Sequence, residues 1–123
     1  DLHRGLVAEH VVGQELLANS EFHAKPGFWV RDKNQSSAEV DYAIAHDEFI
    51  IPVEVKAGKT GKLRSLHQFM EAAPHPYAVR LYAGPFKITP EKTPGGKNFV
   101  LLNAPCFLAS NLQEAIAWML KGN

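Results

Sequence analysis

Apolar and polar positions follow several different periods along the chain, and each period predicts an element. Residues 6–18, LVAEHVVGQELLA, have helical spacing with apolar side chains in two sectors, which predicts a largely buried helix. Glu9 falls within one of these sectors, so its carboxylate requires a partner. A turn signal at residues 25–27 then precedes a short predicted strand at residues 28–31.

The next two segments, residues 38–45 and 49–57, alternate with the period of two that is typical of strands. Together they predict a β-hairpin. If the turn is symmetric about residues 47–48, Asp41 lies directly opposite Glu54 on the neighbouring strand. The hairpin pattern therefore predicts two acids facing each other.

Two features of this hairpin leave alternatives open. Asp47-Glu48 is a poor two-residue turn compared with Asn-Gly, and a loop of odd length would shift the register by one residue. Pro52 lacks the N–H that a strand ladder uses, so it implies either a bulge or one unpaired side.

The C-terminal half predicts a helix between two strands. The apolar stripe of this helix consists of Leu63, Leu66, Met70 and Ala73, and Pro74 and Pro76 end it. Residues 77–83 read as a strand, so a right-handed parallel crossover is the default topology.

Residues 84–98 are rich in Pro, Gly and Lys, and this composition predicts a loop. A short strand is predicted at residues 99–102. Asn111 to Glu114 form a possible capping box that opens a last helix. The inward side chains expected of that helix are Leu112, Ala115, Ile116, Met119 and Leu120.

The length of the chain predicts one domain over residues 1–123. Lys plus Arg equals Asp plus Glu at 13 each, so no global field attracts polyanions and nucleic-acid binding must rely on a local basic patch. No apolar run is long enough for a membrane span. Cys106 is the only cysteine and no secretory signal is recognisable, which favours a soluble protein in the cytoplasm. Because the chain opens at Asp1 without Met, we expect a fragment of a longer polypeptide.

Asp41 and Glu54 would repel each other across a strand pair unless a cation or a proton lies between them. Mg²⁺ suits such a pair, because it binds one or two carboxylates together with substrate phosphate oxygens. Lys56 lies two residues after Glu54 on the same strand face, where its ammonium could orient the attacking water. The alternative is that this E-x-K pattern is the solvated face of an exposed strand. The apolar character of the strand, the acid opposite and the inward Glu9 favour the metal site.

Basic residues follow this pattern closely. Lys59, Lys62 and Arg64 flank the start of the predicted helix, where they could contact backbone phosphates, and a solvated loop is an equal alternative. Gly58-Lys59-Thr60 imitates the end of a P-loop, but the first glycine of that motif would fall at Val53 within a strand. We therefore exclude a P-loop.

The runs AEVDYAI and IIPVEVKAGKTGKLRSLHQF resemble the PD-(D/E)XK nuclease superfamily, and more closely the uncharacterised C-terminal domain of prokaryotic AAA-type ATPases. The resemblance implies an α/β, restriction-endonuclease-like fold: helix, three-stranded antiparallel meander, crossover helix and strand, followed here by a C-terminal strand and helix. It implies Asp41 and Glu54 as ligands of Mg²⁺ or Mn²⁺, Lys56 as the catalytic lysine, and Glu9 or Glu15 as the helix acid.

Two positions depart from that pattern. Val40 replaces the proline for which the superfamily is named, which removes no functional group. Gln68 is followed four residues later by Ala72, so the Gln-x-x-x-Tyr signature of RecB-like members is missing.

The resemblance implies metal-dependent phosphodiester hydrolysis, with nucleic acid and the N-terminal ATPase domain of the same parent chain as partners. An alternative is a catalytically silent module of the same fold that binds nucleic acid or a partner protein for its ATPase. A plain structural domain is a third interpretation.

Overall fold

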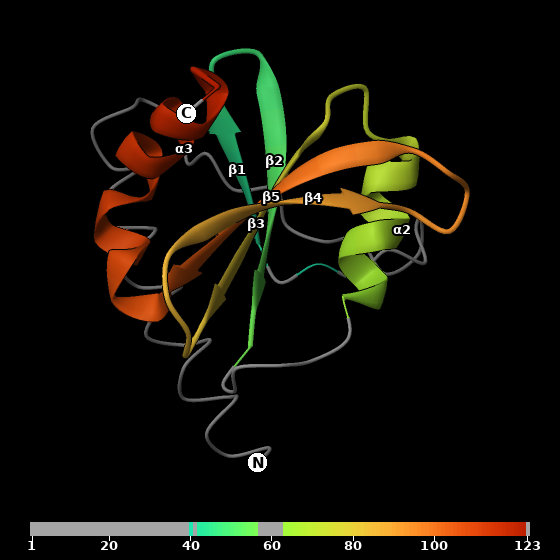
Figure 1. Ribbon diagram of the computed structural model, residues 1–123. Helices are drawn as coiled ribbons and strands as arrows, with labels where there is room; N and C mark the ends of the chain where they lie inside the picture. The colour runs from blue at the N-terminus through green and yellow to red at the C-terminus, as the bar shows by residue number, and fades with distance from the viewer. Residues whose placement is uncertain (1–39, 41, 57–62, 123) are drawn as a thin grey trace.

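A computed structural model describes residues 40, 42–56 and 63–122 of the chain (Figure 1). This part has a mixed α/β fold with a five-stranded sheet. Its elements are β1 (Tyr42–His46), β2 (Phe49–Val55), α2 (Arg64–Ala72), β3 (Tyr77–Tyr82), β4 (Lys87–Lys92), β5 (Asn98–Pro105), the 3-10 helix η1 (Cys106–Asn111) and α3 (Leu112–Leu120). No helix among these residues has the length and apolar character needed to cross a membrane.

The strands follow one another across the sheet in the order β1-β2-β3-β5-β4. β2, β3 and β5 run parallel, whereas β1 and β4 are antiparallel to their neighbours. The carboxyl ends of three strands therefore meet at the same edge. The parallel pairing of β2 with β3 confirms the predicted crossover connection through α2.

The register of the β1–β2 hairpin is the one that a symmetric turn predicts. The ladder runs without interruption from the pair Tyr42–Val53 to the pair His46–Phe49. The turn closes because Asp47 adopts a left-handed conformation with φ of 52°, which Asp tolerates better than most residues. Asp41, whose predicted partner is Glu54, lies outside the described residues.

Pro52 causes no bulge in this hairpin, because it pairs directly with Ala43. The ladder between β2 and β3 begins at Val53, so Pro52 lies just before it. The unpaired side that the sequence predicts is therefore the side toward β3.

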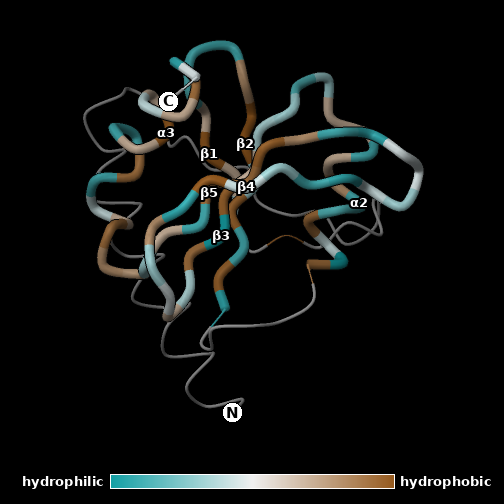
Figure 2. The backbone as a smooth tube through the Cα atoms, viewed as in Figure 1, coloured by the Kyte–Doolittle hydropathy of each residue, from teal (hydrophilic) through white to brown (hydrophobic). Residues whose placement is uncertain are grey.

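Helices pack on both faces of the sheet (Figure 1). On one face, Leu112, Ile116 and Met119 of α3 pack against strand side chains such as Val53 and Leu102. On the other face, the buried stripe of α2 packs against a smaller cluster that contains Leu66, Met70, Ala78, Phe99 and Leu101. The hydropathy colouring shows apolar stretches along β2, the strand that contributes Val53 to the core (Figure 2). The apolar stripes predicted for these two helices are confirmed, and the helix predicted at residues 6–18 lies outside the described residues.

The prediction of a loop over residues 84–98 is wrong. Lys87–Lys92 form β4, which pairs along its whole length with β5. Pro90 conceals this strand in the sequence, because proline argues against a central strand. β4 is at the edge of the described sheet, where a missing N–H is tolerated.

The start of the last helix is also corrected in part. α3 begins at Leu112 as predicted, but Asn111 makes no side-chain capping hydrogen bond. The 3-10 helix η1 leads directly into α3 and supplies the preceding turn of backbone. The prediction of a capping box is therefore wrong, but the predicted last helix is present as α3.

His75 joins three segments of the chain through its ring. Nδ1 accepts a hydrogen bond from the backbone N–H of Tyr77 at 3.1 Å, so the ring proton resides on Nε2, which donates to the carbonyl of Ile50 at 2.7 Å. Burial lowers the pKa of His75 from its ordinary 6.5, although the hydrogen bond to Ile50 acts in the opposite direction. The ammonium of Lys97, which donates to the carbonyls of Ala73 and His75, lowers this pKa further.

This pKa predicts that acid destabilises the fold. Below pH 6.5 the unfolded chain binds a proton at His75 more readily than the folded chain, so the free energy of unfolding falls as the pH decreases through and below 6.5. We expect denaturant unfolding to show this loss between about pH 7.5 and 5.5 and a shallower loss in His75→Asn, whose amide oxygen can still accept from Tyr77. If the free energy of unfolding depends on pH equally in wild type and in His75→Asn, His75 is not the group responsible for the loss.

Candidate functional site

Glu54 and Lys56 lie together at the carboxyl end of β2. The alternation of the strand directs Val53 and Val55 into the core under α3, which leaves Glu54 on the opposite face of the sheet. Glu54 is 7 % exposed, and its Oε1 lies 3.3 Å from Nζ of Lys56. The predicted proximity of these two side chains is therefore confirmed, and the pair joins a buried carboxylate to a partly exposed ammonium.

A row of polar residues continues from Glu54 across the sheet. Arg80 of β3 is the direct partner of Glu54, Asn103 of β5 is the partner of Arg80, and Lys87 of β4 is the partner of Asn103. Residues that face each other in a ladder share one face of the sheet. Four neighbouring strands thus place one polar residue each on the same line, which we call the polar row.

Arg80 is held in place by two contacts. Its Nε donates to Oδ1 of Asn103 at 2.9 Å, and its guanidinium lies 4.4 Å from the centre of the Tyr82 ring. Tyr82 is fixed in turn, because its hydroxyl donates to the carbonyl of Pro85 at 2.8 Å. Gly84 packs against the same ring, where an added Cβ would lie only 2.5 Å from it.

Asn103 is 1 % exposed, and hydrogen bonds hold both ends of its side-chain amide. Its Nδ2 donates to Oγ1 of Thr89 at 3.0 Å and to the carbonyls of Leu101 and Lys87 at 3.2 and 3.3 Å. Because the amide nitrogen faces these acceptors, the amide oxygen must face Arg80. The buried amide therefore fixes the plane of a guanidinium that remains partly open to solvent.

Sequence reasoning missed Arg80 and Asn103. Each interrupts an apolar run within a parallel strand, Arg80 in AVRLY and Asn103 in FVLLNAP. Buried parallel strands are typically continuous apolar runs, so a single polar residue within one was the available signal.

Among the other predicted site residues, Arg64 makes no bond to this row within the described part of the chain, and the rest fall beyond that part. Arg64 is exposed at the first residue of α2 and lines a hollow of about 620 Å³ with residues such as His67 and Pro94. Within the described residues, no hydrogen bond or ion pair joins it to Glu54 or Lys56. The predicted site residues outside the described part are Glu9, Glu15, Asp41, Lys59 and Lys62.

A metal site is only partly represented in the described residues. No group of three or more His, Cys, Asp or Glu side chains that could hold an ion occurs among them. Glu54 offers one carboxylate, which fits Mg²⁺ chemistry because that ion commonly takes one or two carboxylates and completes its shell with water and phosphate oxygens.

Comparison with known families assigns the chain. The profile described as "Domain of unknown function (DUF4143)" matches residues 4–107, which is most of the sequence. The chain belongs to this family. DUF4143 domains are commonly found in proteins associated with AAA-type ATPases, in agreement with that part of the resemblance noted from the sequence. No match was found among the curated proteins or among the solved structures.

The ion pair in this DUF4143 domain predicts a measurable coupling. Lys56→Met removes the ammonium from the buried carboxylate of Glu54 and should lower the free energy of unfolding by about 1 to 2 kcal/mol. Glu54→Gln added to Lys56→Met should recover part of this loss, because no buried charge is left behind. Denaturant unfolding of the two single variants and the double variant measures the coupling, with the exposed Lys92→Met as a control. Strict additivity would show that the contact contributes nothing.

Proposed function

We propose that this domain hydrolyses phosphodiester bonds with the help of a divalent metal ion, through Asp41, Glu54 and Lys56. The observation that carries the proposal is a buried carboxylate with an ammonium 3.3 Å away, at the edge where parallel strands end. Sites in open α/β sheets form beyond the carboxyl ends of the strands. A buried carboxylate with a partly exposed ammonium in that position favours chemistry over a purely structural role.

The hairpin register supports the participation of Asp41. The described ladder ends with Tyr42 opposite Val53, and the register predicted from the sequence continues with Asp41 opposite Glu54. The element order of hairpin, helix and parallel strand supports a restriction-endonuclease-like core. The first helix and the strand at residues 28–31 of that proposed core lie outside the described residues.

In this proposal Asp41 and Glu54 hold Mg²⁺, or Mn²⁺ in its place. The ion would supply Lewis-acid activation of a water and of the phosphoryl oxygen. Glu54 is preorganised for this role, because its neighbours Val53 and Val55 anchor the strand in the core. Lys56 is partly exposed, so its ammonium can move from Glu54 to a phosphoryl oxygen where negative charge develops.

Cleavage of nucleic acid tests the proposal. Single-stranded, duplex and branched oligonucleotides of DNA and RNA are incubated with Mg²⁺ or Mn²⁺, and the products are resolved on denaturing gels. We expect metal-dependent cleavage that falls at least about a hundredfold in each of two variants. Glu54→Gln removes a proposed metal ligand, and Lys56→Met removes a charge that stabilises the transition state. Lys92→Met, at the far end of β4, serves as the matched control and should cleave normally.

Two outcomes would contradict hydrolysis at this site. Cleavage that persists in Glu54→Gln and Lys56→Met would place the chemistry elsewhere or in a contaminant. Absence of cleavage of every substrate by folded wild-type protein would favour the second candidate, a silent module of the same fold that binds nucleic acid or a partner for its ATPase.

The second candidate has its own supporting observation. Lys56 already contacts the carboxylate that a metal would need, and the chain carries no net positive charge to hold a polyanion by itself. Calorimetric titration of Mg²⁺ or Mn²⁺ into the protein, in the presence of a phosphorothioate oligonucleotide, distinguishes the hydrolytic site from the silent module. The hydrolytic site predicts metal binding that Glu54→Gln abolishes, whereas the silent module predicts no binding at millimolar metal in either protein.

A further inference from the structure

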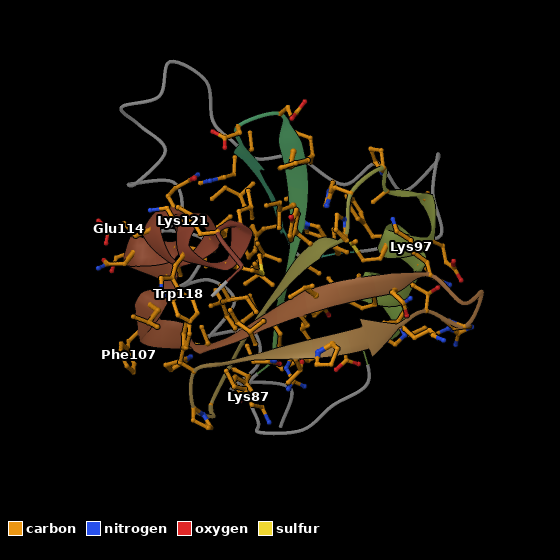
Figure 3. All side chains as sticks on the ribbon, turned by 45° about the horizontal axis from the view of Figure 1, so that its top comes forward. Lys87, Lys97, Phe107, Glu114, Trp118 and Lys121 are labelled. Atoms are coloured by element: carbon orange, nitrogen blue, oxygen red, sulfur yellow. The ribbon has the colours of Figure 1, made fainter. Side chains whose placement is uncertain are left out.

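An apolar groove lies next to the polar row, beyond the ends of β3 and β5. It has a volume of about 670 Å³, and Tyr82, Pro85, Phe86, Pro105 and Phe107 are among the residues that line it. Phe107 is 78 % exposed and Phe86 is 40 % exposed. Figure 3 shows the Phe107 side chain directed away from the ribbon. Both phenylalanines belong to the lining of one apolar groove, and contiguous exposed apolar surface of this kind occurs at interaction sites.

Tyr82 connects the groove with the polar row. Tyr82 is one of the residues that line the groove, and the guanidinium of Arg80 lies over its ring. Next to the groove, the polar row contains two positive side chains, Arg80 and Lys87, and one negative side chain, Glu54. Lys56, which contacts Glu54, adds a third positive charge. An aromatic groove thus borders a locally positive strip in a chain of zero net charge.

We propose that this surface binds single-stranded nucleic acid, with backbone phosphates on Arg80 and Lys87 and an unpaired base in the groove against Phe107. This inference rests on the proposed function, because the bound strand leads along the row to Glu54. Binding itself requires no metal and no cleavage.

The geometry of Arg80 favours a phosphate ligand. Among the described residues, Nε is the only nitrogen of the Arg80 guanidinium that donates a hydrogen bond, and the two terminal nitrogens donate none. A guanidinium of fixed plane with open terminal donors matches two phosphate oxygens at once. The buried Asn103 and the Tyr82 ring provide the orientation that such a fork needs.

The dimensions of the surface favour a strand over a small anion. From Glu54 to Lys87 the row crosses three strand spacings, which is roughly 14 Å and longer than one phosphate group. The groove accepts a flat apolar ring, and base stacking on aromatic side chains is sequence-tolerant. Paired bases in a duplex have their faces covered, so the groove selects unpaired nucleotides.

Fluorescence anisotropy in EDTA tests this binding without cleavage. The probes are a labelled oligo-dT of 12 nucleotides and a duplex of equal length. We expect wild type to bind the single strand more tightly than the duplex. Arg80→Met should weaken binding several-fold and reduce the slope of log K against log salt by about 0.7, which is the effect of one lost phosphate contact.

Phe107→Ala should weaken single-strand binding about fivefold or more without changing the salt slope, because it removes stacking and no charge. Lys92→Met and Ile50→Ala are the matched controls, one basic and one apolar, and both should bind as wild type. If Arg80→Met fails to fold, Lys87→Ala replaces it, since Lys87 is exposed and should also lower the salt slope.

Four results would overturn the inference. The first is equal affinity for the single strand and the duplex, and the second is unchanged binding in folded Arg80→Met and Phe107→Ala. The third is that poly-glutamate displaces the labelled probe as well as unlabelled single strand does. The fourth is a concentration-dependent dimer of this chain that Phe107→Ala abolishes. Glu54→Gln separates this inference from hydrolysis. Single-strand binding by that variant with the expected dependence on Arg80 and Phe107 sustains the inference even where no cleavage occurs.

Discussion

The parallel pairing of β2, β3 and β5 is the constraint on which the polar row depends. Its register places Glu54 beside Arg80 and Arg80 beside Asn103. Alternation then brings all three side chains to one face, while residues such as Val53 and Leu102 fill the opposite core. A shift of one residue in either ladder would exchange the two sets and bury charges in the apolar core.

Asn103 shows how the fold accommodates polarity within this arrangement. A buried amide is costly unless its donors and acceptor are satisfied, and here three acceptors share the two N–H groups of Nδ2 while Oδ1 accepts from Arg80, which makes four hydrogen bonds. Three of these bonds connect the amide to β4 and β5, and the fourth orients Arg80. The edge strand therefore contributes to the site although its own side chains are mostly exposed or partly exposed.

Local features of the chain were predictable from the sequence. The hairpin register followed from alternation and a symmetric turn, and the buried stripes of α2 and α3 followed from helical spacing. The pairing of Glu54 with Lys56 was predictable for the same reason, because two residues on one strand face are close whatever the rest of the fold does. These predictions need only short-range geometry.

The remainder depends on contacts between distant segments. The neighbourhood of Arg80, Asn103 and Lys87 requires the order β3-β5-β4, which inserts β5 between two strands that are consecutive in the chain. No local pattern encodes that order. β4 was not predicted, because Pro90 and the surrounding glycines are typical of a loop. At the start of α3, the 3-10 helix η1 provides a tighter turn of backbone in place of the predicted side-chain cap.

Pro90 on β4 has a consequence for how copies of this protein behave toward one another. β4 is an edge strand of the described sheet, and an edge strand exposes backbone groups that can recruit a strand from another molecule and lead to aggregates. Pro90 removes one of the amide donors from the strand, and Lys87 and Lys92 place a charge at each end. The segment that resembles a loop in the sequence therefore acts as a barrier to intermolecular sheet growth.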